Sequence, residues 1–546
     1  MTNPVRIAHP ASLPWRELLT VAFLAEGTAV LLLAAGPAPG DAPAHLYRTL
    51  LVRDGAFVWD NLWYGGQYPF ASYSLLYYLP AAIFGNLFVM FFAVLVSAVL
   101  FAVIGYHEWG HVARWPVRAF GLAAAAPLFT GLYSYSLGFM TLLAALRFLQ
   151  RGRVTLTVVA AALTLGFSPL AFVFLCIVLF AVLFARRGFA RRTIVLPFAL
   201  AAIAGVQILA LVLFPSYGIY PFNHWDLLAV LAVCTLGVLV SRRSAGARVF
   251  VVFFMAWAGA SVLAFSVPSA LGDNITRLRG VVFPVMLLVA AKAHFRPRVL
   301  VTVALATALA YNVVPYLMLI PYRLDPRPAH AAFWQPALGF LERNRNPDYR
   351  VEVVPTAAHW ESYWLPRAGY ALARGWYRQL DIVQNPVLYE DPLRAPSYAA
   401  WLHRMGIRYV VLPHTKLDPL GGPAEAQLVA GPSLGLREVF NSSTSTIYEV
   451  PDPTPLLTGA PGALITSLTH VGVAGHVRSA GPYLLRLRFS PYWIATPSGT
   501  CVRPSHGDLT QVVLSRAGHF SLRMPGKFGS LLHALTGNGS TCRSSP

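Results

Sequence analysis

Long apolar segments dominate the first 320 residues and restrict what this chain can fold into. A helix of about 15 to 25 apolar residues has the length that crosses a lipid bilayer. Candidate segments lie at residues 17–36, 79–104, 119–133, 137–149, 154–168, 170–185, 193–214, 226–241, 248–267, 280–293 and 299–320. Only 12% of the 546 residues are charged, against about 25% in soluble domains. The sequence therefore predicts an α-helical polytopic membrane protein with about eleven transmembrane helices.

Basic residues recur in short clusters on alternate connections between these segments. The clusters are Arg114 and Arg118; Arg147, Arg151 and Arg153; Arg186, Arg187, Arg191 and Arg192; Arg242, Arg243 and Arg248; and Lys292, Arg296 and Arg298. Because positively charged loops stay inside, the N-terminus is predicted to be cytoplasmic and the C-terminal half extracytoplasmic. This topology accounts for the net charge of +20 without a nucleic-acid partner. The first apolar segment has no small-residue cleavage site, so we expect it to remain as a span.

The composition changes after Pro321, where charges and prolines increase and long apolar runs stop. Strand-like runs at 350–354 and 407–412, with a helical pattern at 398–405 between them, predict an α/β unit. Short alternating runs, such as 483–489, predict a β-sandwich after it. The predicted domains are a transmembrane domain at 1–322 with a first extracytoplasmic loop at 37–78, an α/β domain at 323–455, and a β-sandwich at 456–546 with a flexible tail.

The four cysteines follow this division of the chain. Cys176 and Cys234 lie in apolar segments, where small buried core residues are expected. Cys501 and Cys542 lie in the half predicted to be outside, where an oxidising compartment allows a bridge. We predict that they pair, which would stabilise the fold by about 3–4 kcal/mol in the chain-entropy description.

A zinc-hydrolase pattern, H-E-x-x-H, occurs at His107, Glu108 and His111. The pattern places two imidazoles on one face of a helix, with the glutamate as base. Here it lies at the cytoplasmic end of the second segment, and no convincing third ligand accompanies it. A chain with 15 histidines can contain this short motif by chance, so zinc hydrolysis is the least favoured of the functions considered.

The first outside loop is the better candidate site. Asp41 and His45 follow the first span and are four residues apart, so a helical turn would place them on one face. A carboxylate within hydrogen-bond reach can take the proton from an acceptor hydroxyl, which is what glycosyl transfer requires of a base. The alternative for Asp41 is a cap on the helix that follows it.

A sugar-phosphate donor also needs positive charge at its phosphate. Arg277 and Arg279 are predicted on the outer side and could clamp a lipid phosphate, and Arg48 and Arg53 are further candidates. The aromatic residues of the first loop could pack on sugar rings or acyl chains; the alternative is a belt at the membrane interface, which we prefer for most of them. These residues are Trp59, Trp63, Tyr64 and Tyr68. Asp60 and His224 are weaker candidates.

These features resemble the GT-C superfamily, membrane glycosyltransferases that use polyprenyl-phosphate sugars. The stretches 40–45 (GDAPAH) and 63–69 (WYGGQYP) are similar to an uncharacterised group of bacterial multipass proteins described as related to 6-pyruvoyl-tetrahydropterin synthase. Segments 359–361, 373–381, 405–413 and 489–493 resemble actinobacterial members of that group. The resemblance implies that Asp41 is the catalytic base of an inverting transfer. It places a second acidic residue at Asp60 or Asp273.

The leading hypothesis is therefore a GT-C-like transferase at the outer face of the cell membrane. It would move a sugar from a polyprenyl-phosphate donor in the membrane lipid to an envelope glycan, lipid or protein. Asp41 would be the base; His45, Arg48, Asp60, Tyr64, Asp273, Arg277 and Arg279 would bind substrate. Metal use stays open, with Mg²⁺ or Mn²⁺ as the candidate ions. The alternative is a non-catalytic envelope-assembly or transport protein, in which Asp41→Asn would be silent.

Overall fold

The structure is a computed structural model that describes residues 14–69, 73–185, 194–216, 218–243, 247–323, 325–525 and 539–542. The chain forms two compact units. The first comprises Met1–Pro37, Ser74–Leu209 and Ile219–Pro321, and the second comprises Ala38–Tyr73, Ala210–Gly218 and Tyr322–Pro546. Each unit is described below by itself.

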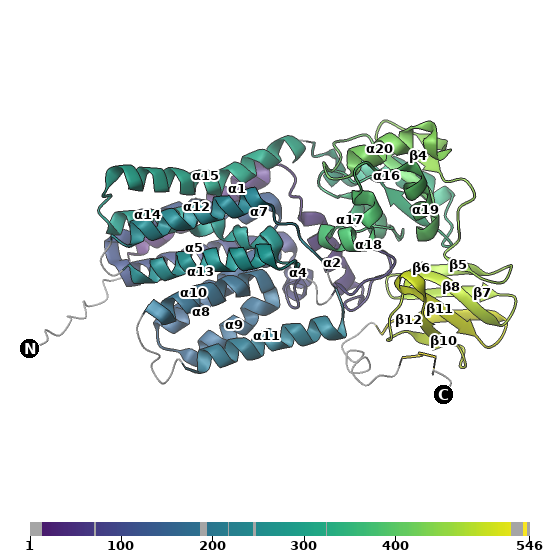
Figure 1. Cartoon of the computed structure of the whole chain (residues 1–546), viewed down its shortest axis with the longest axis horizontal. Helices are drawn as coiled ribbons and strands as arrows, with labels where there is room; N and C mark the ends of the chain where they lie inside the picture. The colour runs from purple at the N-terminus through teal and green to yellow at the C-terminus, as the bar shows by residue number, and fades with distance from the viewer. Residues whose placement is uncertain are drawn as a thin grey trace, which may run out of the picture. The chain divides into compact units, whose positions relative to one another are not determined.

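The first unit is built from helices (Figure 1). They are α1 (Trp15–Ala35), α4 (Tyr78–Phe84), α5 (Asn86–Trp109), η1 (Gly110–Ala113), α6 (Arg114–Ala123), α7 (Ala126–Thr130), α8 (Tyr133–Gln150), α9 (Val154–Phe167), α10 (Pro169–Ala185), α11 (Val195–Leu213), α12 (His224–Ser241), α13 (Arg248–Ser266), η2 (Gly272–Val281), α14 (Val282–Lys292) and α15 (Arg298–Arg323). A continuous apolar core joins α8 to α15. Small residues allow close packing in it: a Cβ on Gly138 would lie 2.6 Å from the Ser168 Cβ.

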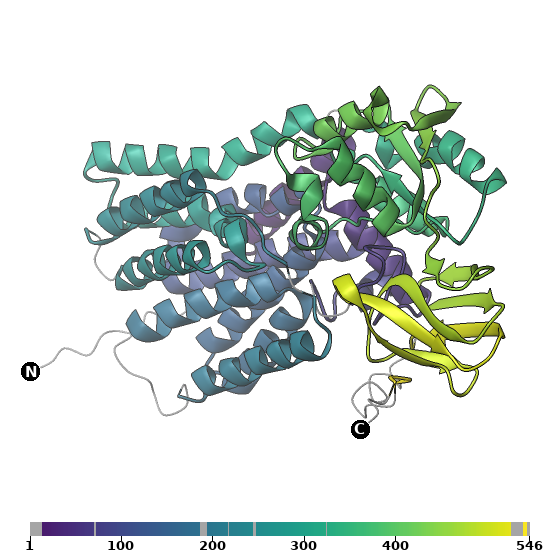
Figure 2. The ribbon, with the colours of Figure 1, turned by 45° about the vertical axis from the view of Figure 1, so that its right-hand side comes forward.

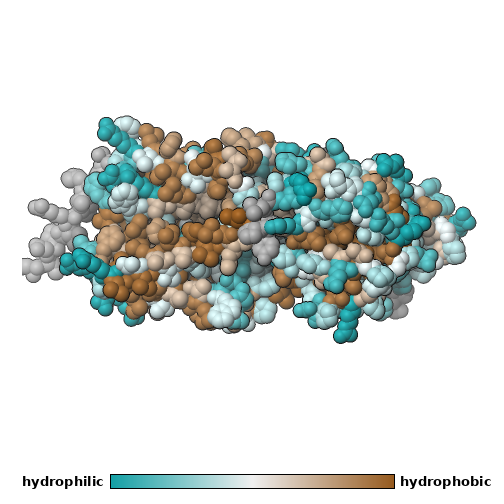
Figure 3. Space-filling view, turned by 90° about the horizontal axis from the view of Figure 1, so that it is seen from above, coloured by the Kyte–Doolittle hydropathy of each residue, from teal (hydrophilic) through white to brown (hydrophobic). Residues whose placement is uncertain are grey.

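Seven of the helices in the described residues are long and apolar enough to cross a membrane. Two shorter apolar helices, α9 and α10, accompany them. Large apolar side chains such as Phe23 and Phe198 are 77% and 74% exposed, as expected of surfaces that face lipid rather than water. Figure 3 shows apolar side chains over much of the helical unit in that view. The structure is therefore compatible with a membrane protein, although it does not confirm the predicted count of eleven spans.

The predicted span at 119–133 does not form one helix. It is divided between the end of α6 and the short helix α7, with a turn at Ala124 and Ala125. Pro127 at the start of α7 has no backbone N–H to continue the hydrogen bonds of α6. Apolar composition alone did not reveal this break.

The α/β part of the second unit contains a four-stranded sheet in the order β1-β2-β4-β3. Its strands are β1 (Arg350–Val353), β2 (Ile407–Pro413), β3 (Arg437–Asn441) and β4 (Ser445–Glu449), of which β1 and β2 are parallel. The helices are η3 (Arg327–Ala329), α16 (Ala331–Arg343), α17 (Glu361–Arg367), α18 (Arg378–Gln384), η4 (Pro386–Tyr389), α19 (Ala395–Met405), α20 (Gly422–Ala430) and η5 (Pro432–Leu434). Tyr398, Trp401 and Ile407 lie at the centre of its core.

The strand-rich end of the chain consists of two four-stranded antiparallel sheets, β10-β11-β8-β5 and β6-β7-β12-β9 (Figure 2). The strands are β5 (Leu457–Thr458), β6 (Leu464–Thr469), β7 (Gly472–Val477), β8 (Gly481–Arg488), β9 (Ile494–Thr496), β10 (Cys501–Pro504), β11 (Leu509–Leu514) and β12 (Gly518–Arg523). The short helix η6 (His506–Asp508) lies between β10 and β11. Alternating side chains of both sheets share one core around Trp493. Cys501 and Cys542 form a disulfide, and Thr541 bridges Val502 beside it.

Residues 38–73 belong to the second unit, although the sequence grouped this loop with the transmembrane half. The loop begins with α2 (Ala42–Arg53) and then turns back on itself, with Asp60 and Gln67 paired across the turn. Asn61 binds the β6–β7 turn through the backbone carbonyls of Thr469 and Gly472. These hydrogen bonds join two parts of the chain that are about 400 residues apart.

Candidate functional site

Asp41 stands at the N-terminus of α2, and its side chain makes no capping hydrogen bond to the helix. The backbone N–H of His45 donates to the Asp41 carbonyl over 3.4 Å, so the helical turn predicted between these residues is present. Asp41, His45 and Arg48 occur at spacings of four and three, which places them on one face of α2. Asp41 is 8% exposed, Arg48 is 2% exposed and His45 is fully buried. The structure therefore does not support the alternative role, in which the Asp41 side chain caps the helix.

Side chains from the C-terminal half hold this end of α2. The indole Nε1 of Trp376 donates to the carbonyl of Gly40 over 2.8 Å. The Arg48 guanidinium lies 4.8 Å from the centre of the Tyr377 ring and donates to the carbonyl of Pro69. The backbone beside Asp41 is therefore fixed by residues more than 300 positions later in the sequence.

The aromatic residues of the loop are core residues rather than a membrane-interface belt. Trp59, Trp63 and Tyr64 are at most 1% exposed, and Tyr68 is 6% exposed. The Trp63 indole donates to the Ser362 carbonyl, and the Tyr64 hydroxyl donates to the Tyr377 carbonyl, both over 2.9 Å. Burial raises the pKa of Tyr64 well above 10. Tyr64, predicted to bind substrate, thus anchors the loop to the α/β part.

Asp60 is fully buried in a polar cluster and does not line an open site. The Tyr47 hydroxyl donates to both carboxylate oxygens over 3.0 and 3.1 Å. The Nδ1 of His470 lies 3.1 Å from Oδ1, and the Leu62 N–H donates to the same oxygen. Burial lowers the pKa of His470, but the hydrogen bond and charge of Asp60 outweigh it and raise that pKa. With these contacts, Asp60 is better suited to anchoring the β6–β7 turn than to binding substrate.

The other predicted substrate ligands lie in the first unit. Asp273, Arg277 and Arg279 are half-buried in η2, a 3₁₀ helix between α13 and α14. The carbonyl of Arg279 accepts a hydrogen bond from Asn312. His224 is the first residue of α12. These residues belong to the first unit and Asp41 belongs to the second, and the two units are described separately.

The H-E-x-x-H residues do not form the zinc-binding helix that the motif requires. Helix α5 ends at Trp109, and Gly110 has a φ of 56°, so His107 and His111 lie on different elements. Glu108 accepts a hydrogen bond from Gln150 over 2.8 Å. Within the described ranges, no group of three or more His, Cys, Asp and Glu side chains is arranged to hold a metal ion.

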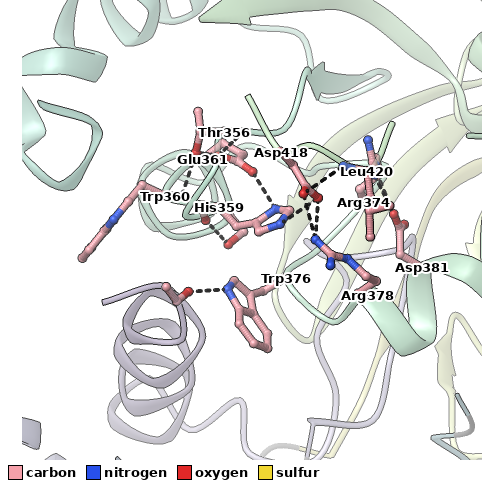
Figure 4. A network of polar contacts seen from close by, with 12 residues as sticks. Thr356, His359, Trp360, Glu361, Arg374, Trp376, Arg378, Asp381, Asp418 and Leu420 are labelled. Atoms are coloured by element: carbon pink, nitrogen blue, oxygen red, sulfur yellow. Dashed lines mark hydrogen bonds and ion pairs between the residues drawn. The ribbon is translucent and has the colours of Figure 1, made fainter. Parts of the chain in front are cut away.

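A buried charged cluster that we did not predict lies at the carboxyl ends of the parallel strands β1 and β2 (Figure 4). The His359 ring lies between two carboxylates, with Nδ1 3.2 Å from Glu361 and Nε2 3.2 Å from Asp418. Arg378 donates to both oxygens of Asp418 over 2.9 and 2.7 Å. The Trp376 ring that holds Gly40 meets the His359 ring edge-on, with centroids 6.5 Å apart. This cluster therefore supports the indole that fixes the backbone next to Asp41.

The protonation of this cluster follows from its geometry. Burial would lower the pKa of His359, but the hydrogen bonds to Asp418 and Glu361 raise it to about 9. Burial would raise the pKa of Asp418, but His359 and Arg378 hold it well below its usual range. His359 also has a φ of 53°, a left-handed conformation that is uncommon outside glycine. A charged imidazole held in a strained conformation points to a specific role for the position.

A second buried cluster surrounds Arg374. Its guanidinium binds Asp381 over 2.8 Å and Glu425 over 3.0 Å, and lies 3.8 Å from Glu352. Glu352 is 1% exposed, and neither carboxylate oxygen makes a hydrogen bond within the described residues. Burial and the nearby Glu425 carboxylate raise the pKa of Glu352 well above 4.5. Burial likewise raises the pKa of Glu425 to about 7, although Arg374 opposes the shift.

The chain offered one signal for these clusters. Segments 359–361 and 373–381 carry most of the residues involved, and both come after the strand-like run at 350–354 in the sequence. Ligands and functional side chains of α/β sheets collect at the carboxyl ends of strands. His359, Glu361 and Asp418 are polar residues that come soon after the predicted strands, but the sequence does not reveal that they pair.

No family model matches the chain, and no curated protein matches it significantly.

Proposed function

We propose that this protein is a membrane-bound glycosyltransferase that takes a sugar from a polyprenyl-phosphate donor and passes it to an acceptor hydroxyl in the cell envelope. The observation that carries the proposal is the polar face of α2. A carboxylate, an imidazole and a guanidinium, from Asp41, His45 and Arg48, follow one another on that face. The apolar helices of the first unit suit a lipid-borne donor.

In this proposal Asp41 acts as the base. Its carboxylate takes the proton of the acceptor hydroxyl while the acceptor oxygen attacks the anomeric carbon. The bond between that carbon and the phosphate oxygen breaks, and the polyprenyl phosphate leaves with the electron pair. Arg48 stabilises the charge on the phosphate, and His45 orients the acceptor or Asp41. The small exposed fraction of Asp41, 8%, favours transfer over hydrolysis because it keeps bulk water from the reacting centre.

Two further groups enter the proposal from the sequence pattern alone. From the sequence, Arg277 and Arg279 are proposed to bind the phosphate of the lipid-borne donor. The distribution of basic loops supports an orientation with the N-terminus in the cytoplasm and the α/β and strand-rich parts outside.

Analysis of envelope glycans and lipids from a deletion strain tests this function. The strain is complemented with the wild type, with Asp41→Asn, or with Asp54→Asn. Asp54 is a matched control because it is an exposed aspartate directly after the same helix. We expect one sugar to disappear in the deletion strain and to return with the wild type and Asp54→Asn only. If Asp41→Asn restores that sugar fully, the proposed chemistry is wrong, and the non-catalytic assembly or transport function takes its place.

A further inference from the structure

Two histidines lie opposite each other on the sheet β6-β7-β12-β9 of the strand-rich part. His476 on β7 and His519 on β12 are direct cross-strand partners in the register of the antiparallel pair. Both side chains are accessible: His519 is exposed and His476 is half-exposed, while their neighbours Val477 and Phe520 point into the core. The two imidazoles therefore lie on the same outward face of the sheet.

The separation of the two rings fits a shared metal ion. Their centroids are 4.9 Å apart, with an angle of 70° between the ring planes. A metal–nitrogen bond of about 2.0–2.1 Å puts the ion about 3.2 Å from the centroid of each ring. Two rings bound to one ion at nitrogen–metal–nitrogen angles of about 90–110° would then have centroids about 4.5–5.2 Å apart. Rotation about χ2, which is broad for histidine, is enough to point one nitrogen of each ring at the ion.

We propose that His476 and His519 form a binding site for a divalent transition-metal ion that prefers imidazole, such as Cu²⁺, Ni²⁺ or Zn²⁺. Imidazole nitrogen suits these ions and does not suit Ca²⁺ or Mg²⁺. No third protein ligand accompanies the pair within the described residues, so water completes the coordination. The bound ion would link β7 to β12, the two central strands of that sheet. The site is independent of the proposed sugar transfer.

Titration of the untagged, full-length protein with Ni²⁺ at pH 7.5 tests the site, with Mg²⁺ as the negative control ion. The wild type should bind one ion per chain, and its unfolding temperature should rise with Ni²⁺. Because two linked ligands bind far more tightly than one, His476→Ala or His519→Ala should weaken binding by roughly 10²-fold. With Cu²⁺, electron paramagnetic resonance of the wild type should show two coordinated nitrogens, and each variant should show one fewer.

His506→Ala is the matched control, because His506 is another exposed histidine of the strand-rich part. It should bind Ni²⁺ as the wild type does. The two test substitutions lie on the solvent face, so their unfolding temperatures without metal should stay close to that of the wild type. The proposal is overturned if the His476→Ala, His519→Ala double variant binds Ni²⁺ as tightly as the wild type, or if His506→Ala alone abolishes binding.

Discussion

At the scale of single residues, the buried charged groups have the largest effect on the stability of this molecule. His359 has two carboxylate partners and Asp60 has a tyrosine and a histidine, so both groups are well compensated. Within the described part of the chain, Glu352 makes no side-chain hydrogen bond, and the Arg374 guanidinium lies 3.8 Å away. An uncompensated buried carboxylate costs stability, and a natural protein retains one where it serves another purpose.

Glu352→Gln should stabilise the protein at alkaline pH. An acid whose folded pKa is raised destabilises the fold progressively as pH rises above its unfolded value, because the folded state must keep a proton that the unfolded state releases. For Glu425 that loss runs from about pH 4.5 to about pH 7, and for Glu352 it begins in the same range. Thermal unfolding in detergent should show Glu352→Gln more stable than the wild type by roughly 1 kcal/mol or more at pH 8, and nearly equal to it at pH 5.

Glu438→Gln, at an exposed position of β3, is the control and should leave the pH dependence unchanged. A Glu352→Gln variant that is less stable than the wild type at pH 8 would show that the carboxylate is compensated in a way its surroundings do not indicate.

His359→Asn should destabilise the protein, because Asp418 and Glu361 would lose the positive charge between them. Asparagine tolerates the left-handed backbone of this position, so the change tests the charge rather than the conformation. We expect a loss of about 3 kcal/mol at pH 6. Since the folded pKa of about 9 lies above the ordinary value of 6.5, the stabilisation is complete below pH 6.5 and disappears as pH rises through 9. Equal stability of variant and wild type at pH 6 would contradict this account.

At the scale of elements, hydropathy predicted the helices well and their tertiary partners poorly. The predicted segments 17–36, 154–168 and 170–185 agree with α1, α9 and α10 to within two residues, because a helix in an apolar environment is apolar along its whole length. Burial of the aromatic residues Trp59, Trp63, Tyr64 and Tyr68 in the 37–78 loop was not predicted. From the sequence alone, the aromatic residues of this loop could equally anchor it at the membrane interface. Contacts such as the hydrogen bond from Trp63 to Ser362, 299 residues apart, show that they are core residues.

The Trp376 indole holds the backbone at Gly40, two residues before helix α2. Trp376→Phe keeps an aromatic ring but removes the N–H donated to Gly40. One lost hydrogen bond is worth about 1 kcal/mol, so the first-turn amides of α2 should exchange with deuterium about fivefold faster. Trp364→Phe is the matched control, because the Trp364 indole N–H makes no hydrogen bond in the described part of the chain. Unchanged exchange in Trp376→Phe, or equal changes in both variants, would argue against this role.

At the scale of the whole molecule, composition predicted a membrane-compatible helical part and a strand-rich C-terminal part, and both are present. The clusters around His359 and Arg374 were not predicted, because their members come from segments up to 73 residues apart and no local sequence pattern indicates their pairing.

The proposed orientation can be tested through Cys501 and Cys542. If cells are treated with a thiol-blocking reagent before lysis, mass spectrometry should find these two cysteines joined and Cys176 and Cys234 unpaired. Both cysteines recovered as blocked thiols would place this part of the chain in a reducing compartment.

The central claim is that Asp41 is the catalytic base of a sugar transfer, and a transfer assay with isolated membranes tests this claim most directly. Membranes containing the wild type, Asp41→Asn or Asp54→Asn are supplied with a panel of labelled polyprenyl-phosphate sugars, and label in envelope acceptors is followed with time. The account predicts transfer from one donor by the wild type and Asp54→Asn. It predicts that Asp41→Asn, present in equal amount, is slower by at least about 10²-fold, as for loss of a catalytic base. Transfer by Asp41→Asn at the wild-type rate would contradict it.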